Sequence, residues 1–113
     1  MDGEPFVKNQ YAFRFLRLDR QQAERVKGEF SDHTVRPAPG NHDRFIVTAG
    51  VSVGTKLDWI ERFVHEEGIS EEHYDFFIST VTDTDTRIVS MPTNMVDLLR
   101  KIGGSVEFSF TVV

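Results

Sequence analysis

The C-terminal segment 87–113 carries the pattern that most constrains the fold of this chain. Its last eight residues alternate, and the apolar side chains on one face are Val106, Phe108, Phe110 and Val112. Before them, a helical stripe ends at Gly103 and consists of Met95, Leu98, Leu99 and Ile102. Alternation with period two is typical of a half-buried strand, and the stripe is typical of a helix that packs on a core. The segment therefore predicts strand, helix and strand, with the apolar face of the last strand buried.

Patterns of the same kind predict the other strands and the domain limits. Alternating apolar residues predict strands at 11–18, 44–53, 74–81 and 87–91, the last two joined by the polar turn 82–86. Segment 31–43 carries two prolines, a glycine and an asparagine, which predict a long connection with room for a short edge strand. Residues 1–10 are predicted to form a flexible N-terminal arm, and residues 11–113 a single domain.

Capping residues predict the helices. Asp19 with Gln22 three residues later forms a capping-box pattern that opens a helix through about Phe30. Thr55 is the predicted cap of a second helix, which ends at Gly68. The order of elements predicts an α+β fold, with a single mostly antiparallel sheet and three helices packed mainly on one face, ferredoxin-like or related.

Composition limits the class of protein. The chain has 113 residues, of which 39% are hydrophobic, and contains no apolar run of about 18 residues, so we expect one globular domain without a membrane span. It contains no cysteine, which removes disulfides, cysteine-ligated zinc and thiol catalysis. The first ten residues lack the basic-then-apolar order of a signal peptide, and we therefore expect a cytoplasmic protein.

One glycine-flanked stretch, 50–56, imitates two catalytic motifs. A phosphate loop needs four residues between its glycines and a Lys before its Thr, whereas this stretch has three residues and the reverse order. The same letters spell Gly-x-Ser-x-Gly around Ser52, with His65 and His73 as later bases. That motif requires a large parallel sheet, which 113 residues hardly provide. We expect no catalytic residue and no enzymatic activity.

Histidines and aspartates offer a weaker alternative, a metal or ligand site. His33 and His42 share segment 31–43 with Asp32 and Asp43, but no helical pair or His-x-His pair presents two rings to one ion. Asp83 and Asp85 lack the glycine and distal glutamate of a calcium loop. No cofactor and no metal site are expected, and the alternative function is a small-ligand or metal-binding module that uses segment 31–43.

The negative charge is concentrated in one segment, 58–85. This segment has nine acidic residues against the single base Arg62, while the remainder of the chain has twelve bases against nine acids. A field of one sign steers a partner of the opposite sign, so we predict a partner-binding surface. Its candidate residues are Asp58, Trp59, Glu61, Glu66, Glu67, Glu71, Glu72, Tyr74, Asp83 and Asp85. The aromatic pair Trp59 and Tyr74 would serve as anchors.

The partner classes follow from the same charge distribution. The acidic surface argues against direct nucleic-acid binding, because phosphate contacts need Lys and Arg. The N-terminal strand and helix are locally basic, which permits a homo-oligomer formed head to tail, and the basic residues are Arg14, Arg17, Arg20, Arg25 and Lys27. A structural, oligomer-forming domain is therefore a further alternative.

The chain combines an aromatic first strand, a helix that contains Trp59, and a last helix that ends Leu99-Arg100-Lys101-Ile102-Gly103 before an aromatic strand. This combination resembles a bacterial family of domains of unknown function. The resemblance is best over residues 55–113. Members of that family usually carry a Trp near a Lys-Gly-Asp turn, from which segment 36–41 departs. Some members are immunity-like, so the resemblance implies an immunity or antagonist role. We therefore expect a non-enzymatic acidic protein that binds and occludes a basic effector such as a toxin or nuclease.

Overall fold

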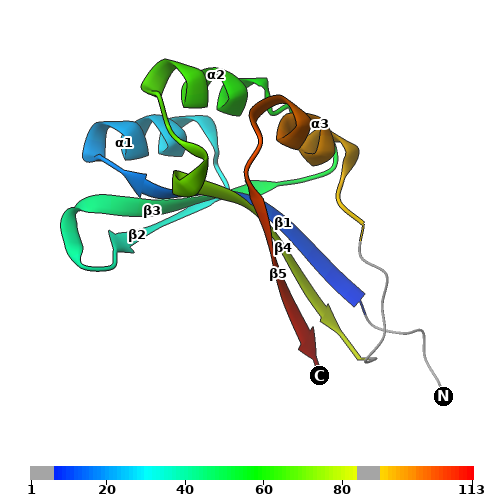
Figure 1. Cartoon of the computed structure of the whole chain (residues 1–113). Coiled ribbons are helices and arrows are strands. Elements are labelled where there is room, and N and C mark those ends of the chain that lie inside the picture. Colours follow the sequence, from blue (N-terminus) through cyan, green and yellow to red (C-terminus); the bar gives the residue numbers. More distant parts are fainter. Residues whose placement is uncertain (1–6, 84–89) are drawn as a thin grey trace.

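A computed structural model describes residues 7–83 and 90–113, which form one sheet with three helices on one side of it (Figure 1). The strands are β1 (Val7–Leu18), β2 (His33–Ala38), β3 (Asn41–Val51), β4 (Tyr74–Thr82) and β5 (Ser105–Val112). The helices are α1 (Arg20–Glu29), α2 (Asp58–Glu67) and α3 (Thr93–Ile102), with a short 3-10 helix, η1 (Glu71–His73). The predicted α+β class, with helices on one face of a single sheet, is confirmed.

The sheet has the strand order β2-β3-β1-β4-β5. Three neighbouring pairs are antiparallel, and only β4 and β5 run parallel. Parallel neighbours need a crossover connection, and α3 lies within the one between β4 and β5. The elements from β1 to β4 follow a β-α-β-β-α-β order, and α3 with β5 extends the sheet beyond β4. The sheet is therefore mixed, and most of its strand pairs are antiparallel as predicted.

The core lies between the helices and the central strands, and aromatic rings form its centre. Phe13 and Phe15 of β1 and Phe76 of β4 are at most 1% exposed. The Phe13 ring meets the Phe76 ring edge-on with centroids 5.0 Å apart, and Phe15 meets Phe63 of α2 in the same way at 5.4 Å. Such pairs contribute about 0.5–1.5 kcal/mol each beyond the burial of their area. This aromatic centre fixes the helices over the middle of the sheet.

The predicted ends of α1 and α2 are confirmed at two positions. The Asp19 carboxylate accepts a hydrogen bond from the Gln22 backbone at 2.8 Å, and the Gln22 side chain accepts one from the Asp19 backbone at 2.9 Å. This is the capping box that the sequence predicted. At the end of α2, Gly68 has a φ of 62°, a left-handed conformation that glycine adopts without strain.

The predicted cap of α2 is wrong. The helix begins at Asp58 with Leu57 in the cap position, and no side chain caps it. The hydroxyl of Thr55 is already engaged, because it accepts a hydrogen bond from the Ser52 backbone N–H at 2.9 Å. Thr55 therefore closes the turn that precedes the helix.

Segment 31–43 is a β-hairpin, where the sequence predicted a long connection with room for an edge strand. β2 is that edge strand, it pairs antiparallel with β3, and Gly40 with a φ of 72° lies in the turn. The first strand also begins earlier than predicted, at Val7, because residues 7–10 pair with β4. The predicted strand 87–91 lies mostly outside the described residues, and Ser90 and Met91 are not in a strand.

The sheet extends past the helices on one side. There β1, β4 and β5 continue together as a three-stranded extension, which we call the strand arm and define as residues 7–11, 78–82 and 108–112 (Figure 1). In its register Phe108 lies opposite Ile78, and Phe110 lies opposite Thr80. Only Lys8 is charged within these ranges. The arm is therefore an almost uncharged part of the sheet that projects from the helix-covered part.

Candidate functional site

The candidate functional site is the outer edge of β5 together with the apolar row on its helix side. Phe108, Phe110 and Val112 are 63%, 46% and 50% exposed. Their neighbours on β4 in the same rows are buried, with Ile78 1% and Thr80 2% exposed. Large apolar side chains therefore reach solvent directly beside buried positions of the sheet.

The prediction that the apolar face of the last strand is buried is wrong beyond Val106. Val106 packs against the core, because it lies beside Phe76 under the helix layer. Helix α3 ends at Ile102, and the glycines 103 and 104 lead directly into β5, which then extends beyond the helices (Figure 1). None of the described helices covers the arm. Alternation in a sequence reports that one face is apolar, but not whether another element covers it.

The outer edge of β5 carries few of the features that protect an edge strand. β5 is the last strand in the sheet order, and within residues 7–83 and 90–113 nothing pairs with its outer side. It has eight residues, no proline, and Glu107 as its single charge. An unpaired edge presents a row of free N–H and C=O groups to any strand that reaches it. This edge is therefore open to another strand.

The opposite edge, β2, is built differently. It has six residues and includes Arg36 and Pro37. A proline has no N–H to donate, and charged side chains on an edge oppose pairing with another chain. Val35 is 39% exposed, so β2 also offers an apolar side chain, but beside a charge and a proline. One edge of the sheet is thus protected, and the other is open.

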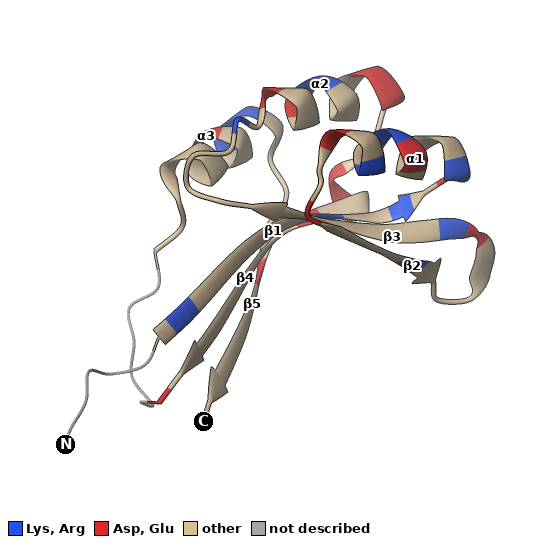
Figure 2. Cartoon of the chain, turned by 180° about the vertical axis from the view of Figure 1, so that it is seen from behind, with Lys and Arg blue, Asp and Glu red and all other residues tan. Residues whose placement is uncertain are grey.

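Six of the nine acidic residues of segment 58–85 lie on α2 and η1, and the structure does not place the others with them. Asp75 belongs to the face of the sheet opposite the helices, Asp83 follows the end of β4 at the tip of the arm, and Asp85 lies outside the described residues. Figure 2 shows acidic and basic segments interspersed along the helices. Asp58, Glu71 and Glu72 are exposed on the helix side.

Basic residues from other parts of the chain pair with several of these carboxylates. Arg25 of α1 donates to Glu67 at 2.8 Å and to Glu66 at 3.3 Å. Lys101 of α3 lies 3.7 Å from Glu61. Arg25, which the sequence placed on a basic surface for a head-to-tail contact, thus pairs with carboxylates of the same chain at the surface. These ion pairs link α1 and α3 to α2.

The most buried of these pairs joins Arg14 to Asp75 on the helix-free face. The guanidinium donates two hydrogen bonds to the carboxylate, at 2.7 and 2.6 Å, and lies 4.4 Å from the centre of the Phe77 ring. Asp75 is 4% exposed. The hydrogen bond with Asp75 raises the pKa of Arg14, so the guanidinium remains charged. Its role is structural, because the two side chains satisfy each other between β1 and β4.

The two predicted aromatic anchors are not free for a partner. Tyr74 is 1% exposed and donates a hydrogen bond from its hydroxyl to the Ile102 carbonyl at 2.7 Å. Burial, followed by the charge of Glu71, raises its pKa above the ordinary 10.0. The Trp59 ring stacks on Phe63 with centroids 4.7 Å apart and is only partly exposed. Both residues hold the core.

The alternative metal site in segment 31–43 is not assembled among the described residues. His33 lies at the start of β2, and its Nδ1 is 2.6 Å from the Phe30 carbonyl oxygen. His42 lies near the hairpin turn at the other end of β2, where the ladder closes between Ala38 and Asn41. No group of three metal-ligating side chains occurs among the described residues.

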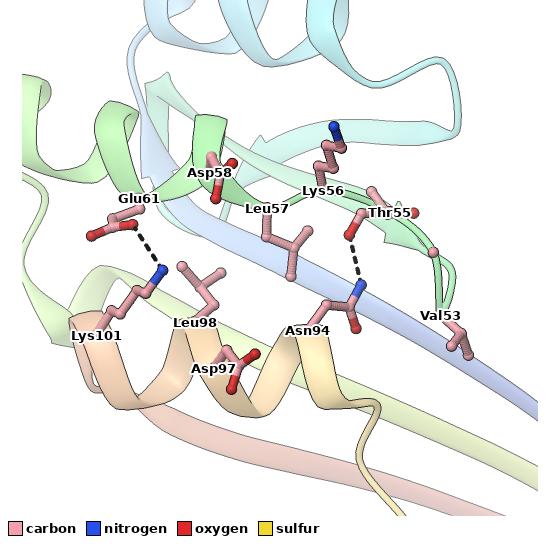
Figure 3. A pocket seen from close by; sticks show the side chains of 11 residues that line it. Val53, Thr55, Lys56, Leu57, Asp58, Glu61, Asn94, Asp97, Leu98 and Lys101 are labelled. Carbon is pink, nitrogen blue, oxygen red and sulfur yellow. Dashed lines mark hydrogen bonds and ion pairs between the residues drawn. The ribbon is translucent and has the colours of Figure 1, made fainter.

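The glycine-flanked stretch 50–56 forms a structural turn next to a pocket between α2 and α3 (Figure 3). The Ser52 hydroxyl is 2.8 Å from the Thr55 hydroxyl and contacts no histidine. The Asn94 side chain donates to the Ser52 carbonyl at 3.0 Å and to the Thr55 carbonyl at 2.7 Å. These bonds fasten the turn to α3. They engage the hydroxyl and carbonyl groups of Ser52 and Thr55 within the chain.

No helix among the described residues is long and apolar enough to span a membrane. Searches against protein-family models, curated proteins and solved structures gave no match to this chain. The resemblance to a bacterial family of domains of unknown function therefore stays a prediction.

Proposed function

We propose that this chain is a non-enzymatic protein-binding domain that engages its partner through the open edge of β5. The observation that carries this proposal is the exposed row of Phe108, Phe110 and Val112 beside an unpaired strand edge. Exposed aromatic residues on a surface poor in charge are typical of the centre of protein interfaces. The strand arm has this composition, whereas the helices carry most of the charged residues (Figure 2).

The mode of binding is strand addition. The backbone of β5 pairs with an extended segment of the partner and supplies most of the affinity. The phenylalanines on the helix side of the strand then select partners that place apolar side chains beside them. Glu107 lies on the opposite face, so it does not interrupt the apolar row.

The geometry gives less support to the basic effector that the charge pattern predicted. Such a partner needs a continuous acidic surface, and Glu61, Glu66 and Glu67 are already paired with basic residues of the same chain. Exposed ion pairs are worth little singly. An immunity or antagonist role remains compatible with the proposal if the effector adds a strand to β5.

The test is an affinity capture with three versions of the chain. Wild type, the double variant Phe108→Lys/Phe110→Lys and the control Val35→Lys are used as bait, and each captured protein is identified, purified and rebound. We expect a complex that wild type and Val35→Lys form and the double variant does not. Circular dichroism checks that all three chains are folded. A partner that binds the double variant with wild-type affinity contradicts the proposed function.

A further inference from the structure

The open edge of β5 has a sequence that complements itself. Two copies related by a twofold axis use the same surface, so each residue of the strand meets a defined residue of the other copy. When two copies pair their β5 edges antiparallel, a twofold axis perpendicular to the sheet passes midway between the two copies of one residue. The helices of both copies then lie on the same side of the joined sheet. The residue at the axis fixes the register of the pairing.

An axis beside Ser109 gives the longest register. Ser105 begins the strand, and Val113 still donates its N–H to the Thr82 carbonyl at 2.8 Å, so the paired segment is 105–113. Ser109 is its midpoint. With the axis there, Phe108 lies opposite Phe110 of the second copy. Every residue of the segment then has a partner in the other copy.

The same register places apolar side chains opposite apolar ones and keeps the charged residues of the two copies apart. Val106 lies opposite Val112 of the second copy, next to the two phenylalanine pairs, so the helix-side row is apolar throughout. Glu107 lies opposite Thr111 of the second copy, so the Glu107 residues of the two copies are four positions apart along the paired strands. An axis beside Phe108 would make the two glutamates diagonal neighbours, about 7–8 Å apart, where like charges destabilise pairing. Charge and apolar contacts therefore favour the same register.

From this self-complementarity we infer that the partner of the β5 edge is a second copy of this chain, paired antiparallel about Ser109 to form one continuous ten-stranded sheet. The inference rests on the proposed function, because it names the partner of the same edge. The four phenylalanines then lie together on the helix side, between the helix layers of the two copies. The open edge is the surface that this pairing buries.

The buried area sets the strength of the dimer. A phenylalanine buries about 150–250 Å² in a full contact, so the exposed parts of Phe108 and Phe110 amount to roughly 200 Å² per copy. A stable interface buries about 800 Å² per partner, which the valines and the backbone only partly supply. Interfaces of this small size are typical of weak, reversible complexes, so we expect a dimer with a Kd of roughly 10–100 µM.

Cysteine cross-linking tests the register. The chain has no cysteine, so Ser109→Cys introduces a single thiol at the axis. Opposite residues of antiparallel strands have Cα atoms about 4.5–5.5 Å apart, which a disulfide spans. We expect Ser109→Cys to form a covalent dimer about tenfold faster than the control Ser105→Cys. Glu107→Cys and Thr111→Cys are expected to cross-link when mixed and much less when oxidised separately.

The outcomes separate this inference from the proposed function. If Ser109→Cys links no faster than Ser105→Cys, and wild type sediments as a monomer at several hundred micromolar, about tenfold above the expected Kd, the second copy is not the partner. A dimer that persists in Phe108→Lys/Phe110→Lys also overturns the inference, because it uses another surface. If a different purified protein still requires the β5 edge, the proposed function stands. If no complex depends on that edge, both are wrong.

Discussion

The phenylalanines of the helix-covered centre and those of the strand arm belong to the same sheet but have different surroundings. Phe76 of β4 is 0% exposed beneath the helices, whereas Phe110, on the helix side of β5, is 46% exposed. Both belong to alternating strands with the same helix-side orientation. An alternating strand thus specifies which side chains share a face, while the neighbouring strands and the elements packed over that face decide which of them are buried. At the outer strand β5, beyond the helices, the apolar face is exposed to solvent.

The largest difference in stability between the two regions is expected when one phenylalanine ring is removed from each. Phe76→Ala removes a ring from the packed centre, and we expect it to lower the free energy of unfolding by about 3–5 kcal/mol through lost burial and a cavity. Phe110→Ala removes a ring that is half exposed, and we expect a loss below about 1 kcal/mol in the monomer. Urea unfolding at a concentration well below the dimer Kd measures both. Equal losses would remove the distinction between centre and arm.

A second test compares a buried carboxylate with an exposed one. Asp75→Asn weakens the acceptor of the two Arg14 hydrogen bonds in a buried site, and we expect a loss of about 1–3 kcal/mol. Glu66→Gln alters a solvent-exposed contact with Arg25, and we expect no more than about 0.5 kcal/mol. The same urea titrations report both values. A large effect at Glu66 with none at Asp75 would mean that the acidic helix face, not the sheet, carries the important charges.

A third test uses the pH dependence of Tyr74 in the covered region. Its pKa is raised in the folded chain above the ordinary 10.0, so the folded state holds its proton at a pH where the unfolded state has lost it. This contribution is fully present below about pH 10 and is lost as pH rises through the folded pKa. We expect the stability lost between pH 9 and 11 to be smaller in Tyr74→Phe than in wild type, which urea midpoints at each pH measure. Identical slopes would show that Tyr74 is not buried in solution.

The smallest effects on stability are expected from the edges themselves. Phe108→Lys and Val35→Lys both replace an exposed side chain, and each should change the stability of the monomer by no more than about 0.5 kcal/mol. Their effects on association should differ, because only Phe108 lies on the open edge. Sedimentation equilibrium should show weaker self-association than wild type for Phe108→Lys and unchanged self-association for Val35→Lys. Weaker association for Val35→Lys as well would mean that β2 also contributes to the interface.

Local chemistry predicted most of the fold. Asp19 and Gln22 predicted the start of α1, Gly68 predicted the end of α2, and alternation predicted β1, β3, β4 and β5 to within a few residues. The start of β1 was missed because residues 8–10 are polar and are strand only through their pairing with β4. The cap of α2 was misplaced because Thr55 makes a turn bond to Ser52 that its spacing from Asp58 does not reveal.

The candidate site was predicted less well, because it depends on contacts between distant residues. The acidic segment suggested one surface, but Arg14 pairs with Asp75 across 61 positions and Arg25 pairs with Glu67 across 42. No local pattern indicates such pairs. The apolar row of β5 was visible in the sequence, and its exposure was not. A useful signal was present all the same: an edge strand with two phenylalanines and a single charge lacks the usual protection against pairing.

Amide hydrogen exchange along β5 measures, residue by residue, whether the outer edge of this strand is paired with a second copy. In a strand paired on one side only, alternate N–H groups point inward to β4 and the others point to the open edge. At concentrations about tenfold above the dimer Kd we expect the outward amides of β5 to become protected, and on dilution about tenfold below it to exchange rapidly, while β2 does not change. Outward amides of β5 that exchange as rapidly at high concentration as at low would contradict the claim that this edge binds a second copy.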